Sequence, residues 1–219
     1  METSYTPKDI SGEAVKRVAQ IKKHFQKNDL LLFSVMKTMR FEPLTVEKNP
    51  KLYFSKLCGE IAAQQLSGKA ADTIFKRFLK LFPRERISPN GVLKYSDGEL
   101  RQTGISWAKA RYLRDLAEKT RSRELQFSNI QKLPDEGVIR ELTKVKGIGR
   151  WTAEMFLIFT LGREDVFSFG DLGLRKGLER VYGKKRVSTQ KRIETIIGRW
   201  HPYCSYGSLA LWHVIDSGK

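Results

Sequence analysis

Apolar residues recur at spacings of three and four along most of this chain, which predicts an all-α protein. After Pro50 they mark one face of a helix that reaches about residue 62. A second apolar face runs from Ala71 to Phe82, where Pro83 stops the helix. Ser67 is well placed to cap the start of this second helix. No convincing strand alternation exceeds four residues, so the pattern favours helices throughout.

Capping residues predict several further helices. Ser96 and Glu99 form a capping-box pair, and Ser106 caps the helix after it. The apolar positions of that later helix, which should face the core, are Ala110, Leu113, Leu116 and Ala117. Pro134 and the two acidic residues after it mark another start, and the remaining predicted helices cover about 171–182, 189–199 and 203–215.

The segment from Trp151 to Leu161 differs from these amphipathic helices because nearly every residue in it is apolar. A helix that is apolar all round is typical of a fully buried element. Gly162 closes it. We therefore expect this helix to lie at the centre of a core.

The charge of the chain narrows the choice of partner. The 219 residues have a formal net charge of +17, which points to DNA, RNA or an anionic membrane surface. No run of about 18 apolar residues could span a membrane. Cys58 and Cys204 form no CxxC pair or four-cysteine set, and the three histidines are scattered along the sequence. We thus expect reduced thiols, no zinc and no iron–sulfur cluster.

The turn Lys146-Gly-Ile-Gly149, between two predicted helices, is the most informative segment. Its glycines let the backbone turn sharply and approach a ligand closely. The amides and the positive dipole end of the following helix suit a phosphate oxygen. Lys144, Lys146 and Arg150 add positive charge. The spacing of the two glycines alone is compatible with binding of a nucleic-acid backbone or with a plain interhelical turn.

Residues 142–153, Leu-Thr-Lys-Val-Lys-Gly-Ile-Gly-Arg-Trp-Thr-Ala, resemble the helix–hairpin–helix of the DNA glycosylase superfamily. Segments 61–71, 104–109 and 200–205 resemble its alkylpurine branch, the 3-methyladenine DNA glycosylase II type. The resemblance covers about residues 40–215. It implies an all-α, two-lobed fold, with a central helical barrel over 50–160 and a second lobe made of 1–49 and 161–219. The active site of such a fold lies in the cleft between the lobes.

The resemblance also implies an activity: monofunctional excision of alkylated purines, such as 3-methyladenine and 7-methylguanine, from duplex DNA in base excision repair. Asp171 follows the hairpin at the family's spacing of about 20 residues and would be the catalytic carboxylate, although its local sequence alone favours a helix N-cap. Asp165 is the nearest alternative carboxylate. Trp151 stands where bifunctional members carry a Schiff-base lysine, so no lyase activity is expected.

Further site residues follow by matching position. Trp151 and Tyr203 match pocket positions whose aromatic faces attract cationic purines. Met155 stands where a relative has Tyr, which makes the pocket softer. Gln65 matches the residue that fills the gap left by the flipped base. The residues expected to contact DNA are Gln65, Lys144, Lys146, Gly147, Ile148, Gly149, Arg150 and Thr152.

The family's hairpin often binds Na⁺ or K⁺ through backbone carbonyls, and the matching positions are Thr143, Val145 and Ile148. No other cofactor is expected. The expected partner is alkylated double-stranded DNA rather than a membrane. We expect a monomer located with DNA inside the cell, in a bacterial or archaeal cytoplasm or in a nucleus. Two alternatives remain open: a glycosylase for mismatched or oxidised bases, and a non-enzymatic DNA-binding hairpin module.

Overall fold

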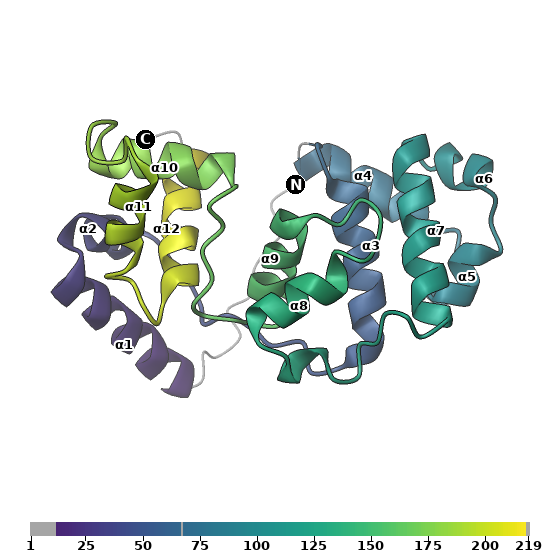
Figure 1. Ribbon diagram of the computed structural model, residues 1–219, viewed down its shortest axis with the longest axis horizontal. Helices are drawn as coiled ribbons and strands as arrows, with labels where there is room; N and C mark the ends of the chain where they lie inside the picture. The colour runs from purple at the N-terminus through teal and green to yellow at the C-terminus, as the bar shows by residue number, and fades with distance from the viewer. Residues whose placement is uncertain (1–11, 67, 218–219) are drawn as a thin grey trace. The chain divides into compact units, whose positions relative to one another are not determined.

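The computed structural model describes residues 12–66 and 68–217, and every regular element in these ranges is helical (Figure 1). The chain divides into two compact units. The central unit is Thr45–Gly162, and the terminal unit combines the residues up to Leu44 with those from Arg163 onward. None of the described helices is long and apolar enough to cross a membrane.

The central unit is built from a series of mostly short helices. In chain order they are α3 (Tyr53–Ala63), α4 (Gly68–Leu79), α5 (Pro89–Leu93), α6 (Asp97–Gln102), α7 (Trp107–Arg121), α8 (Asp135–Leu142) and α9 (Arg150–Phe159). The predicted capping box of Ser96 and Glu99 is present, and Ser106 caps α7. The four α7 residues predicted to face the core are all buried. Helix α7 packs against α3, as Figure 1 shows.

The terminal unit is built from helices at both ends of the sequence. They are α1 (Gly12–Asn28), α2 (Leu30–Thr38), α10 (Leu172–Tyr182), α11 (Gln190–Ile197) and α12 (Cys204–Asp216). A buried carboxylate, Asp29, joins three of its segments. Its Oδ1 caps α2 by accepting from the Leu32 amide at 3.1 Å. Its Oδ2 accepts from the Tyr182 hydroxyl at 2.6 Å and from Trp200 Nε1 at 3.0 Å. The buried charge is thus stabilised by hydrogen bonds.

The prediction that the segment from Trp151 to Leu161 is buried on all sides was wrong for Trp151 and Phe159, near the two ends of helix α9. Helix α9 buries every residue from Thr152 to Ile158, including Glu154. Trp151 and Phe159, in contrast, are 42% and 45% exposed. An apolar residue is not necessarily a core residue, because an aromatic side chain can also line a surface pocket. Each of these two aromatic side chains lines a hollow in the surface.

Smaller differences concern helix ends. Helix α4 ends at Leu79, three residues before the predicted Phe82, because the chain turns through residues 80–82 before Pro83. Ser67, the predicted cap of α4, lies outside the described residues. The two cysteines are unpaired thiols, as expected, and both are buried. Burial raises the pKa of the Cys58 thiol well above its usual range.

Candidate functional site

The turn between α8 and α9 uses its two glycines differently. Gly147 has φ +81°, and a Cβ there would overlap the ring of Tyr112. Only glycine satisfies both conditions. Gly149 has φ −91°, and no neighbouring atom lies within 4 Å of the place a Cβ would take. Its backbone therefore faces open space at the N-terminus of α9, where amides and the helix dipole favour an anion.

A second turn lies beside this hairpin. Helix α3 ends at Ala63, and Gln64 Nε2 donates to the Gly147 carbonyl at 2.8 Å and to Thr152 Oγ1 at 3.4 Å. Gln65 follows with φ +58°, the left-handed region that non-glycine residues rarely adopt. Such backbone strain persists only where the surroundings hold it. The hydrogen bonds of Gln64 provide part of that support.

Lys109 provides the other part. Its Nζ donates to the Ala62 carbonyl at 2.9 Å and to the Gln64 carbonyl at 2.5 Å, at the C-terminal end of α3. Burial lowers the pKa of this ammonium. Carbonyls at a helix end lack partners within the helix, and Lys109 supplies one from α7. Lys109 therefore braces the turn that presents Gln65.

A pocket of about 420 Å³ opens between the two turns. Its lining residues are Gln64, Gln65, Ser106, Ala108, Lys109, Tyr112, Gly147, Trp151 and Thr152. Four of the residues predicted to act on DNA or base lie there together: Gln65, Gly147, Trp151 and Thr152. The Trp151 ring is partly exposed, whereas Thr152 is buried.

The positive side chains of the hairpin differ in their availability. Arg150 pairs with Glu136 and, at 2.9 Å, with Glu154; the hydrogen bond with Glu136 chiefly raises the pKa of Arg150 and lowers that of Glu136. Lys144 Nζ lies 2.8 Å from Glu141. Lys146 is exposed, and no carboxylate of the described residues lies within ion-pair distance of its ammonium. Its backbone amide donates to Asp115 Oδ2 at 2.8 Å, which fixes the turn.

The predicted catalytic carboxylate belongs to the terminal unit. Asp171 is the N-cap of α10, and its Oδ1 accepts from the Leu174 amide at 2.7 Å and from Trp212 Nε1 at 3.3 Å. Asp171 is buried, with 8% of the residue exposed. A Cβ on Gly173 would lie 3.0 Å from this same oxygen, so glycine allows the close packing. The capping role that the local sequence favours is real, and it also holds the carboxylate in a defined orientation.

The other predicted pocket residues are buried. Tyr203 belongs to the core of the terminal unit, with the His24 ring 5.1 Å away and the Arg17 guanidinium 5.1 Å from its ring centre. Arg17 also pairs with Glu164, whose hydrogen bond raises the pKa of Arg17. Met155 is 5% exposed within α9. Neither side chain lines the pocket at the hairpin.

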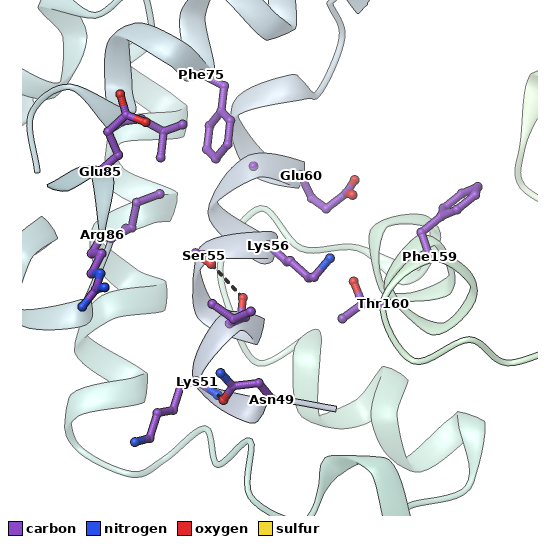
Figure 2. A pocket seen from close by; sticks show the side chains of 14 residues that line it. Asn49, Lys51, Ser55, Lys56, Glu60, Phe75, Glu85, Arg86, Phe159 and Thr160 are labelled. Carbon is purple, nitrogen blue, oxygen red and sulfur yellow. Dashed lines mark hydrogen bonds between the residues drawn. The ribbon is translucent and has the colours of Figure 1, made fainter. Parts of the chain in front are cut away.

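A larger hollow of about 740 Å³ lies elsewhere on the central unit, between α3, α4, residues 85–87 and the end of α9 (Figure 2). Lys56 and Glu60 of α3 line it, together with the exposed Phe159. Burial raises the pKa of the Glu60 carboxyl, and Lys56 partly opposes this shift. No residue predicted to contact DNA or base lines this hollow.

Comparison with known proteins identifies the family. Residues 58–202 match the model of the HhH-GPD superfamily of base excision DNA repair proteins. The chain belongs to this superfamily. The match contains the hairpin, the Gln64–Gln65 turn and Asp171, so the geometry described above falls within the family's own region. The helix–hairpin–helix glycosylase fold expected from the sequence is confirmed.

Several relatives of this chain are named as DNA-3-methyladenine glycosylases. The putative DNA-3-methyladenine glycosylase YfjP of Bacillus subtilis is 30% identical, over 71% of this chain and 56% of the relative. DNA-3-methyladenine glycosylase 1 of Schizosaccharomyces pombe is 35% identical, over 64% of this chain and 62% of the relative. The chain thus spans about three-fifths of the length of these two curated relatives.

Solved HhH-GPD structures match over more of their length. A DNA-3-methyladenine glycosidase from Bacillus halodurans is 35% identical, with a TM-score of 0.75 over 91% of this chain and 90% of that one. Schizosaccharomyces pombe Mag1 in complex with abasic DNA is 27% identical, with a TM-score of 0.73 over 90% of this chain and 97% of that one.

Proposed function

We propose that this protein is a monofunctional DNA glycosylase that removes alkylated purines from double-stranded DNA during base excision repair, in the compartment that holds DNA. The observation that carries the proposal is the hairpin pocket, which gathers Gln65, Gly147 and Trp151 in a chain of this superfamily. The relatives named as 3-methyladenine glycosylases support the alkylpurine class.

In this proposal the hairpin holds the DNA backbone without reading its sequence. The open backbone at Gly149 and the N-terminal amides of α9 accept a phosphate, and the Lys146 ammonium adds an attractive charge. Arg150 and Lys144 contribute less, because neighbouring carboxylates already neutralise them. The side chain of Gln65 fills the space left in the duplex by the extruded base, which offsets part of the cost of unstacking.

Asp171 carries the chemical step. Breaking the N-glycosidic bond leaves positive charge on the sugar, and a fixed carboxylate stabilises that charge and orients or deprotonates the attacking water. The hydrogen bonds from Leu174 and Trp212 hold the carboxylate in place before the reaction begins. The products are a free base and an abasic site. Trp151 has no amine to form a Schiff base, so the strand stays intact.

Aromatic residues recognise the base. The exposed ring of Trp151 offers an electron-rich face to an alkylated purine that carries positive charge. We also assign base recognition to Met155 and Tyr203, whose side chains are buried and do not line the hairpin pocket. The proposed enzyme is a monomer, so a single chain supplies the catalytic, base-binding and DNA-binding residues.

The hairpin also has suitable donors for a monovalent cation. The carbonyls of Thr143, Val145 and Ile148 follow the C-terminal end of α8, where the helix dipole favours positive charge. Val145 O accepts only the Ile148 amide among the backbone donors described, so a second lone pair remains. Exchanging K⁺ for Li⁺ at constant ionic strength should weaken DNA binding if this site is used.

A panel of duplexes tests the function. The full chain is incubated with DNA that contains an alkylated purine, a mismatch or an oxidised base, and abasic sites are revealed by alkali. We expect abasic sites in the alkylated duplex alone. Preference for a mismatched or oxidised base would replace the proposed specificity. Tight binding without any abasic sites would instead identify a non-enzymatic DNA-binding module.

A further inference from the structure

A cluster of three potential metal ligands lies at the start of α12. His201 Nδ1 is 2.8 Å from Asp165 Oδ2 and 3.5 Å from Cys204 Sγ, and the three donor atoms all lie within 4.8 Å of one another. The sequence does not indicate this group, because Asp165 lies 36 residues from His201 and no local spacing links the two. Folding of the terminal unit alone brings the three residues together.

The spacing suits a tetrahedral ion. With bonds of about 2.0 Å to nitrogen and about 2.3 Å to sulfur, two tetrahedral ligands of Zn²⁺ lie about 3.5 Å apart. The distance between His201 Nδ1 and Cys204 Sγ has this value. The Asp165–His201 contact is a hydrogen bond and would need to open by about half an ångström to admit the ion. Imidazole, thiolate and carboxylate together form a ligand set that zinc uses.

The surrounding backbone holds the ligands in place. Asp165 Oδ1 accepts from the Cys204 amide at 3.3 Å, and the Ser205 amide donates to the Glu164 carbonyl at 2.9 Å. The Val166 amide donates to Ser205 Oγ at 3.0 Å. These bonds join the loop before α10 to the first turn of α12. Asp165 and His201 are exposed, whereas Cys204 is buried, so an ion would enter past the carboxylate and imidazole.

We propose that Asp165, His201 and Cys204 bind a thiophilic divalent cation of the Zn²⁺ class. On binding, the thiol loses its proton to solvent, and the sulfur, the neutral imidazole nitrogen and a carboxylate oxygen each donate a lone pair to the ion. Water completes the fourth position. The three proposed ligands are different residues from Asp171 and from the hairpin residues. Its effect is to fix the first turn of α12 to the loop that precedes α10.

Cobalt provides the most specific probe. Co²⁺ is titrated into the metal-free full chain, and the absorption from thiolate-to-cobalt charge transfer is recorded. We expect one equivalent to give this absorption, and Zn²⁺ to remove it by displacing the cobalt. Cys204→Ser should abolish the absorption. Cys58→Ala is the matched control. It should retain the absorption, because Cys58 does not belong to the cluster of Asp165, His201 and Cys204.

Further variants separate ligand loss from misfolding. Asp165→Asn keeps an oxygen that can cap the Cys204 amide, and His201→Gln removes the imidazole. Each should weaken Zn²⁺ binding by at least about tenfold, since losses of this size follow even when residues behind the ligands are changed. His213→Gln should bind like the parent. Absence of a thiolate–cobalt absorption in the folded parent would overturn the proposal, as would unchanged Zn²⁺ affinity in the folded Asp165→Asn and His201→Gln variants.

Discussion

The hairpin of the central unit and the Asp171 corner of the terminal unit are stabilised in different ways. Around the hairpin, partners distant in sequence hold the backbone: Gln64 bonds to Gly147, and Asp115 bonds to the amide of Lys146. The space beside Gly149, at the N-terminus of α9, is left open. Asp171 instead caps its own helix through the Leu174 amide and also accepts a hydrogen bond from Trp212. In the proposed function, DNA binding therefore depends on the backbone shape of the hairpin, and excision depends on the oriented charge of Asp171.

The largest expected effect separates charge from shape at Asp171. Asp171→Asn keeps an oxygen that can cap α10, so the melting temperature and DNA affinity should change little. The charge is lost, and single-turnover excision should fall by at least about 10²–10³-fold. Release of a methylated purine is measured for both proteins beside their thermal melts. Near-normal excision by the folded variant would leave Asp171 as a cap and move the search for the carboxylate to Asp165.

The two hairpin glycines give the next comparison. Gly147→Ala must displace the Tyr112 ring and adopt a positive φ. The free energy of unfolding should therefore fall by about 1–3 kcal/mol, and DNA binding should weaken. Gly149→Ala has room and an ordinary φ, so its stability should match the parent. A methyl group there would still hinder a phosphate. Denaturant melts and DNA titrations of both variants check this, and equal destabilisation by the two changes would contradict it.

Removing the brace of the Gln65 turn should have a moderate effect. Lys109→Met leaves the Ala62 and Gln64 carbonyls without their donor, which should cost about 1–3 kcal/mol of stability. If Lys109 positions Gln65, the excision rate at saturating enzyme should fall more than DNA affinity does. Lys109→Arg should restore part of the rate. Lys80→Met, at an exposed lysine of the same unit, is the control. Equal losses of rate and affinity would argue for a purely structural role.

The smallest effects concern single charges on the hairpin. Lys146→Gln should weaken binding to all duplexes alike and reduce the slope of log affinity against log salt by about 0.9. Lys144→Gln should change the slope less, because Glu141 already neutralises this lysine. Binding is measured at several salt concentrations on two unrelated sequences. A loss confined to one sequence would mean that the hairpin reads bases.

Local signals predicted much of the fold and less of the site. The capping box at Ser96 and the core positions of α7 follow from spacing alone, because neighbouring residues determine them. The bond from Gln64 to Gly147 crosses 83 positions, and the bond from Trp212 to Asp171 crosses 41, so no local pattern reports them. For Trp151 the apolar run predicts burial and the resemblance predicts a pocket position, and the structure exposes 42% of the residue beside a pocket.

The most direct test of the central claim counts both products of one reaction. Duplex DNA that carries a methylated purine is incubated with the full chain, and the free base and the abasic sites are measured in the same sample. We expect one free methylated base for each abasic site, with strand breaks only after alkali and no protein trapped on DNA by borohydride. Strand breaks without alkali, together with a borohydride-trapped complex, would contradict a water-dependent monofunctional glycosylase.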